Sequence, residues 1–295
     1  MGADLDYEHP DVIQEAKNWA EWYLEFTDVD GFRVDAVKHI KYGFLRGWVE
    51  HLKNISDKNI FVVGEFWEYN VEKLHQFIVK TGGRLHLFDA PLHLNFYKAS
   101  RESGFNGAYD MRRLFDHTLL KDQPSLAVTL VENHDTQPLQ ALESPVEYWF
   151  KPLAYAAILL RQEGYPCVFC ADYFGATYSD KGYDIHMLPV KKLKELIKAR
   201  KLFAYGYQHN YIDHPNTIGW TREGDEKHPG SGCAVIMTNG SDGYKWMYAG
   251  KRNTKKKYID FLDYRTEIVN INSDGWGKFS CNAGSVSVWV DRNNI

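Results

Sequence analysis

An arginine and a carboxylate stand two residues apart near the start of the chain, at the end of the strand-like run 30–35. Side chains of a strand point alternately to its two faces, so Arg33 and Asp35 share one face. A buried cation beside a carboxylate favours the ionised form that a nucleophile needs at neutral pH. We therefore expect Arg33 to be buried and Asp35 to be a catalytic nucleophile.

Two further acids follow strand-like runs downstream. The apolar run 60–64 leads into Glu65, and the run 127–131 leads through a short polar stretch into Asp135. Buried parallel strands read as near-continuous apolar runs, and in a (β/α) barrel the residues just past them form the active site. The three carboxylates are thus predicted to converge on one rim. A competing interpretation, that each acid caps the next helix, explains one of them more readily than all three.

Helical and strand-like patterns alternate over the first two hundred residues, which indicates a parallel barrel or sheet. Helices are predicted at 10–26, 41–54, 71–80, 108–120, 145–163 and 189–203, and strands near 30–35, 60–65, 86–89, 127–132 and 166–171. From about Ala204 the pattern changes to short alternating runs with turns, which predicts an antiparallel β-sandwich. Its strands are expected at 233–238, 245–248, 267–271 and 285–290.

Several segments resemble a known family. The runs 31–39 (GFRVDAVKH), 64–67 (GEFW) and 131–135 (VENHD) resemble three short regions of the α-amylase family of glycoside hydrolases, and 3–10 (ADLDYEHP) resembles a fourth. The likeness extends over nearly the whole chain and is to bacterial members of the liquefying and cytoplasmic type. It implies endo-hydrolysis of α-1,4-glucosidic bonds in starch, glycogen and maltooligosaccharides by a retaining double displacement.

The resemblance assigns Asp35 as nucleophile, Glu65 as general acid/base and Asp135 as transition-state stabiliser. A retaining glycosidase needs one ionised and one protonated carboxyl group, and the surroundings agree with this. Arg33 favours the ionised form of Asp35, whereas the aromatic pair after Glu65 favours its protonated form through desolvation. The side chains expected to bind substrate are Arg33, Lys38, His39, Trp67 and His134.

The number of strands departs from a complete barrel. Five strand candidates precede the sandwich, where a closed barrel has eight, and in the family the nucleophile lies on the fourth strand. We therefore expect a partial (β/α)8 TIM barrel, about strands 4 to 8, over residues 1–204, followed by a sandwich domain over 205–295. The chain is expected to be truncated at its N-terminus, inactive by itself, and monomeric when complete.

Acidic residues near the N-terminus point to a cation. Asp4, Asp6 and Glu8 alternate along the chain, which suits Ca²⁺ in an extended segment, although such stretches are also common on solvated surfaces. The resemblance matches Asp4 and the carbonyl of His39 to calcium ligands, and Asp6 and Glu8 to a neighbouring cluster. We expect weak calcium binding, because the remaining ligands would come from the missing part.

Composition restricts the other functions. A net charge of −4 gives no electrostatic case for nucleic acid, and no apolar run reaches the roughly 20 residues of a membrane span. Cys167 and Cys170 lie in an apolar run and are predicted to be buried thiols rather than a redox or zinc pair. The scarcity of paired cysteines favours a cytoplasmic location. A secreted parent that lost its signal is the alternative.

Three other functions stay open. A fragment could bind glucan or assist assembly without turnover, and glucan affinity without hydrolysis would favour it. A transglycosylase of the same family would be separated by analysing its products. An unrelated barrel enzyme could use the three carboxylates to hold a metal, and activity that survives chelation would speak against it.

Overall fold

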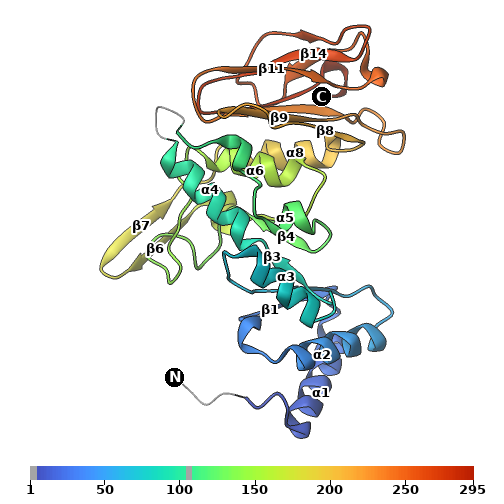
Figure 1. The fold of residues 1–295 in the computed structure, drawn as a ribbon, viewed down its shortest axis with the longest axis vertical. Helices are drawn as coiled ribbons and strands as arrows, with labels where there is room; N and C mark the ends of the chain where they lie inside the picture. The colour runs from blue at the N-terminus through green and yellow to red at the C-terminus, as the bar shows by residue number, and fades with distance from the viewer. Residues whose placement is uncertain (1–4, 104–107) are drawn as a thin grey trace. The chain divides into compact units, whose positions relative to one another are not determined.

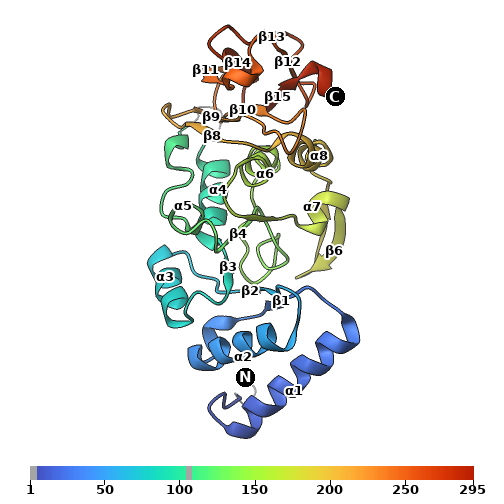
Figure 2. The ribbon, with the colours of Figure 1, turned by 90° about the vertical axis from the view of Figure 1, so that its right-hand side faces the viewer.

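A computed structural model describes residues 5–103 and 108–295 of the chain (Figures 1 and 2). Its residues form two compact units. The first comprises Met1–Pro91 with His117–Thr129, and the second comprises Leu92–Asp116 with Leu130–Ile295. Asp35 and Glu65 therefore belong to the first unit, and Asp135 belongs to the second.

The first unit is built on short parallel strands with helices between them. β1 pairs with β2, β2 with β3, and β3 with β4, all in parallel. The elements are α1 (Pro10–Thr27), β1 (Gly31–Val34), η1 (Val37–His39), α2 (Tyr42–Ile55), β2 (Phe61–Gly64), α3 (Val71–Lys80), β3 (His86–Phe88), α5 (Leu119–Asp122) and β4 (Ala127–Leu130), whose last residue opens the second unit.

Helix α1 illustrates how the sequence sets an element. Pro10 stands in its first turn, where a missing N–H costs nothing, and the His9 side chain accepts a hydrogen bond from the Asp11 N–H. The helix ends where Asp28 turns into the left-handed region at φ 54°. Its inner face joins α2, as Figure 2 shows, in a core that includes the fully buried Val49. The helix predicted at 10–26 is confirmed.

The second unit contains helices and antiparallel sheets. Its elements are α4 (Ala90–Glu102, which begins at the boundary), η3 (Met111–Arg113), α6 (Lys151–Leu160), β5 (Tyr165–Cys167), α7 (Cys170–Phe174), β6 (Ala176–Asp180), β7 (Tyr183–Met187), α8 (Leu193–Phe203), β8 (Gln208–Tyr211), β9 (Thr217–Arg222), β10 (Cys233–Thr238), β11 (Gly243–Tyr248), η4 (Lys251–Asn253), β12 (Lys257–Asp260), β13 (Val269–Asn270), β14 (Trp276–Cys281), β15 (Val286–Asp291) and η5 (Arg292–Asn294). None of the helices among the described residues has the length and apolar character needed to cross a bilayer.

Two antiparallel sheets make up the C-terminal part of this unit. One has six strands in the order β13-β12-β15-β10-β9-β8, and the other pairs β11 with β14. The sheets form two layers in Figures 1 and 2, with Met247, Phe279 and Trp289 fully buried between them. The two-sheet core and the strands expected near 233–238, 245–248 and 285–290 are confirmed, whereas the domain boundary at 204/205 stays a prediction.

The five strands expected in the alternating region are present, in the sheet order β1-β2-β3-β4-β5. The strand predicted at 166–171 is too long, because the chain leaves β5 at Cys167 and enters α7 at Cys170. Both thiols are exposed, so the prediction that they are buried is wrong, whereas Cys233 and Cys281 are buried. An apolar run marks a buried strand only while the chain stays extended.

Other differences concern helices. The helix predicted at 108–120 is wrong, because this stretch holds only the short η3 and the start of α5, and Asp110 caps η3 by accepting the Arg112 N–H. The helix predicted at 145–163 is confirmed only over Lys151–Leu160, the residues of α6. Helix α4 lies outside the predicted elements, although its buried residues Leu92, Phe96 and Ala99 recur at helical spacing.

Candidate active site

The Arg33 and Asp35 side chains lie together at the carboxyl end of β1. Arg33 Nη1 is 2.7 Å from Asp35 Oδ1, so the shared face predicted from strand alternation is confirmed. The side chains are 38% and 74% exposed, which corrects the expectation that Arg33 is buried. An ion pair so open to water contributes little to stability, because solvent screens it.

The backbone next to Asp35 leads directly to Glu65. Ala36 adopts a left-handed conformation at φ 46°, and its N–H donates to Glu65 Oε2 at 3.0 Å. Two backbone hydrogen bonds join the same loops, from the Glu65 N–H to the Val34 carbonyl and from the Val37 N–H to the Glu65 carbonyl. A left-handed non-glycine residue costs energy and persists only where its surroundings hold it. These bonds place both carboxylates at one edge of the paired strands β1 and β2.

The residues around these carboxylates differ in exposure. Lys38 and His39 lie in the turn η1 and are exposed. Trp67 is buried, with 8% of its surface exposed, and its Nε1–H donates to the Tyr69 hydroxyl at 3.2 Å. Phe66 packs against Phe77 rather than standing free. The substrate-binding roles of these residues stay predictions.

Metal ligation by the described residues is not supported. Asp4 lies outside the described residues, Asp6 Oδ1 accepts the Glu8 N–H, and the Glu8 carboxylate is 3.7 Å from Lys41 Nζ. Over residues 5–103 and 108–295 no three His, Cys, Asp or Glu side chains group closely enough to hold a metal ion. The calcium-binding roles of Asp6, Glu8 and the His39 carbonyl stay predictions.

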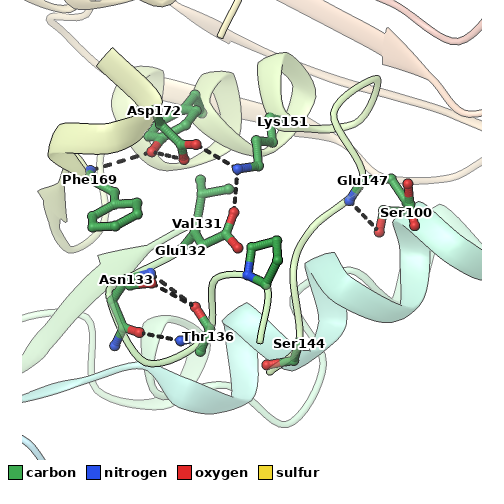
Figure 3. A network of polar contacts seen from close by, with 12 residues as sticks. Ser100, Val131, Glu132, Asn133, Thr136, Ser144, Glu147, Lys151, Phe169 and Asp172 are labelled. Carbon is green, nitrogen blue, oxygen red and sulfur yellow. Dashed lines mark hydrogen bonds and ion pairs between the residues drawn. The ribbon is translucent and has the colours of Figure 1, made fainter. Parts of the chain in front are cut away.

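Asp135 lies in a loop of the second unit that is braced by its own polar groups. Asn133 Oδ1 accepts the backbone N–H groups of Asp135 and Thr136, each at 2.9 Å, and Figure 3 shows the contact with Thr136. Asp135 and Thr136 in turn accept from the N–H groups of Leu142 and Ser144 through their carbonyls. His134 Nε2 is 3.3 Å from Asp135 Oδ2, and both side chains are at least a third exposed. The loop thus presents the His134 and Asp135 side chains to solvent.

A buried charge network, not predicted from the sequence, lies directly before this loop. Lys151 Nζ contacts the carboxylates of Glu132 and Asp172 (Figure 3). The Tyr155 hydroxyl donates to Asp172 at 2.6 Å. The side chains of Glu132, Lys151 and Asp172 are at most 7% exposed. Burial raises the pKa of Glu132 to about 7, against the opposing effect of Lys151. Burial would lower the pKa of Lys151, but the charges of Asp172 and Glu132 outweigh it and raise that pKa.

Helix α4 braces the same loop from a second side. His93 Nδ1 donates to the Val131 carbonyl at 2.8 Å, and its Nε2 lies 2.9 Å from Ser144 Oγ. One ring therefore holds both ends of the loop that carries Asp135. Burial lowers the pKa of His93 to about 4, so the ring is neutral at neutral pH. Lys151 and His93 each stand inside an apolar run of the sequence, and this could have indicated buried polar side chains. Such side chains need partners, so a polar network was to be expected around them.

The chain is similar to known proteins over nearly its whole length. The chain matches the family model for the catalytic domain of alpha amylase over residues 2–204. It is 54% identical over 292 residues to an alpha-amylase of Geobacillus stearothermophilus, covering 99% of this chain and 52% of that one. It is 48% identical over 295 residues to a cytoplasmic alpha-amylase of Escherichia coli (strain K12), covering 98% of this chain and 59% of that one.

A solved structure shows the same fold. The alpha-amylase of Geobacillus thermoleovorans complexed with acarbose superposes with a TM-score of 0.73 at 18% identity, covering 97% of this chain and 65% of that one. This chain spans about half the length of the two sequence relatives. Because the family model covers more than half of the chain, the chain belongs to the alpha-amylase catalytic-domain family.

Proposed function

We propose that this chain supplies the three catalytic carboxylates of a retaining endo-hydrolase of α-1,4-glucosidic bonds in starch, glycogen and maltooligosaccharides. The observation that carries the proposal is the link across β1 and β2, in which the amide next to Asp35 donates to Glu65. Asp35 and Glu65 follow the carboxyl ends of two paired strands. One carboxyl group can attack the anomeric carbon there while the other transfers a proton to the leaving oxygen. The segment is proposed to correspond to about strands 4 to 8 of the barrel.

The proposed reaction has two steps. Asp35 attacks the anomeric carbon and Glu65 gives its proton to the leaving glycosidic oxygen, which leaves a glycosyl ester on Asp35. Glu65 then takes a proton from water, whose oxygen replaces Asp35 at the same carbon. Asp135 stabilises the positive charge that develops on the sugar ring. Arg33 orients the Asp35 carboxylate through its 2.7 Å contact.

Four other side chains are proposed to hold the glucan. Lys38 and His39 would bind the glucose units on the leaving-group side, while Trp67 and His134 would contact the sugar near the reacting bond. Calcium is proposed to bind through Asp4 and the His39 carbonyl, next to Asp6 and Glu8, with further ligands from beyond these described residues. Calorimetric titration with CaCl2 tests this, and micromolar binding by residues 1–295 alone would contradict the weak site expected.

The central test uses a chimera in which this chain replaces the matching half of the Geobacillus stearothermophilus relative. Glu65→Gln keeps the size of the side chain but removes its proton, so we expect release of reducing sugar from starch to fall by at least a thousandfold. Glu68→Gln is the matched control, since its exposed partner Lys73 lies 2.7 Å away on the surface. Activity of Glu65→Gln within tenfold of the parent would overturn the assignment.

The products separate hydrolysis from transfer. Chromatography of the chimera's products should show shortened linear maltooligosaccharides from the first minutes, as internal cleavage requires. Products longer than the supplied maltooligosaccharide would instead identify a transglycosylase. A cytoplasmic location and a monomeric state are also proposed. The location is supported by the 48% identity to the cytoplasmic alpha-amylase of Escherichia coli. Cell fractionation and sedimentation of the complete protein test these two properties.

A further inference from the structure

The hairpin β6–β7 (Figure 1) ends in an unusual turn. Asp180 pairs with Tyr183 at the end of the hairpin, so Lys181 and Gly182 alone form the turn. Both are left-handed, with φ of 49° and 81°, as in a type I′ turn. Asparagine, aspartate or glycine is usual at the first position of this turn, and a lysine there costs more conformational energy. Such a residue persists only where its surroundings hold it.

This hairpin is bonded to three consecutive residues in the middle of the loop that carries Asp135. The three contacts run from the Tyr178 hydroxyl to the Pro138 carbonyl (2.6 Å), from Lys181 Nζ to the Leu139 carbonyl (2.5 Å), and from Gln140 Nε2 to Asp180 Oδ2 (3.1 Å). Leu139 is also left-handed, at φ 65°. Tyr178 and Asp180 share one face of β6, because they are two residues apart on the strand. One face and the tip of the hairpin therefore hold the turn 138–140.

The turn 138–140 is coupled to Asp135 through the backbone. Two residues after the turn, the Leu142 N–H donates to the Asp135 carbonyl at 2.9 Å. His93 and the buried charge network hold the ends of the loop, whereas the contact from Lys181 is exposed. An exposed hydrogen bond contributes little to the stability of the whole chain, because water competes for both partners. The hairpin contacts thus bear on the position of the loop more than on the stability of the fold.

We propose that Tyr178 and Lys181 are positioning residues, which hold the middle of this loop and thereby fix where the Asp135 carboxylate stands. The role of Asp135 in transition-state stabilisation rests on the proposed function. A carboxylate acts on the developing charge only at close range, and misplacing a catalytic group by about 1 Å can cost roughly a hundredfold in rate. Because this interaction is made in the transition state, its loss lowers kcat more than it raises KM.

Hydrogen–deuterium exchange of the 295-residue chain tests the positioning directly, without any assay of activity. Tyr178→Phe/Lys181→Met removes both donors and keeps the aromatic ring and the aliphatic chain. Peptides spanning 135–144 should exchange at least tenfold faster in this variant than in wild type, because the middle of the loop loses its anchors. Peptides over α6 should exchange alike in both proteins, which would show that the unit stays folded.

The matched control lies on the opposite face of the same strand. Thr177→Val/Ser179→Ala removes two exposed hydroxyl groups. Their partners, His186 Nδ1 at 3.3 Å and Asp184 Oδ1 at 2.5 Å, belong to the hairpin itself. This variant should leave the exchange of 135–144 as it is in wild type.

Steady-state kinetics of the chimera on soluble starch measure the consequence for the proposed reaction. The value of kcat should fall at least tenfold in Tyr178→Phe/Lys181→Met, with KM within threefold of the parent. Thr177→Val/Ser179→Ala should match the parent. Lys181→Arg, which can still donate to the Leu139 carbonyl, should keep kcat within threefold, a rescue that a general loss of packing would not show.

Two results would overturn the proposal. One is equal exchange of 135–144 in wild type and in Tyr178→Phe/Lys181→Met. The other is faster exchange of this segment with an unchanged kcat, which would mean that the hairpin holds the loop without positioning Asp135 for the reaction. A parent chimera that fails to hydrolyse starch would instead overturn the proposed function, and the exchange measurement would still decide whether the hairpin holds the loop.

Discussion

Buried charges next to Asp135 set the energetics of its loop. Lys151 is the cation shared by Glu132 and Asp172, and all three side chains are almost completely buried. The desolvation of such a group is offset only while its partners stay in place. Glu132 lies three residues before Asp135, so this network adjoins the start of the loop.

Removing the shared cation should therefore be costly. Lys151→Met leaves two buried carboxylates without their partner, and we expect it to lower the free energy of unfolding by about 3 to 5 kcal/mol. Arg101→Met is the control, since its pair with Glu147 at 3.2 Å is about half exposed and should contribute at most about 1 kcal/mol. Urea unfolding of both variants measures this. Equal losses would show that the buried network is not a major source of stability.

His93 makes stability depend on pH. Its pKa is lowered from 6.5 to about 4, so between these values the unfolded chain binds a proton that the folded chain excludes. Stability is therefore lost as the pH falls through this window, by roughly 2 to 3 kcal/mol at pH 4.5. Glu132 acts in the opposite sense, because its raised pKa makes folding more favourable as the pH falls below 7.

The variant His93→Gln separates the two groups. Glutamine does not titrate, so the contribution of His93 disappears while that of Glu132 remains. Denaturant unfolding at pH 7 and pH 4.5 should show a smaller acid-induced loss in the variant than in wild type, by roughly 2 kcal/mol. Identical pH dependence in the two proteins would mean that His93 is already protonated in the folded state or does not titrate in this range.

At the level of elements, the pairing of β1 with β2 holds Asp35 and Glu65 together. Gly31 faces Phe61 in this register, and a Cβ at Gly31 would lie 2.2 Å from the Phe61 carbonyl oxygen. Backbone cannot move away from such a contact without shifting the strand. The close approach at Gly31 is thus a condition for the register that places both carboxylates at one edge.

Two glycine substitutions test this with opposite expected signs. Gly31→Ala should destabilise the chain by more than about 2 kcal/mol and reduce the chimera's hydrolysis, because the strands must separate or slip. Gly47→Ala lies inside α2 with nothing within 4 Å of the new Cβ, so it should stabilise by about 0.5 to 1 kcal/mol. Thermal and urea unfolding measure both. A neutral Gly31→Ala would contradict the register argument.

For the whole molecule, the number of strands in the sheet that carries Asp35 and Glu65 leads to a prediction about activity. Five strands of the described residues form one sheet, in which β1 to β4 pair in parallel, whereas a closed barrel needs eight. We expect the 295-residue chain alone to release no maltooligosaccharides from starch, because an unclosed sheet leaves strand edges unpaired and the site open to water. The parent chimera, assayed in parallel, should be active. Robust hydrolysis by the chain alone would contradict this expectation.

Features of the fold that depend on residues close together in the sequence were predicted better than features that depend on residues far apart. Helix α1 and the strands before Asp35, Glu65 and Asp135 were predictable, because periodicity and caps act over a few residues. The change from strand β5 to helix α7 near Cys170 was not predictable, because a short apolar run is equally compatible with a strand and with a buried helix. Helix α4 was predictable from the helical spacing of its buried residues. Its contacts with the Asp135 loop were not, because they join residues that are 38 and 51 positions apart in the sequence.

The sequence alone determined the family and predicted that Arg33 and Asp35 share one face, while the catalytic roles drawn from it stay proposals. Tertiary structure decided which distant groups meet: Ala36 with Glu65, 29 residues on, and His93 with Ser144, 51 residues on. It also decided that Arg33 is exposed and that Lys151 is buried between two acids. Burial and charge pairing depend on the packing of elements remote in sequence, which no local pattern encodes.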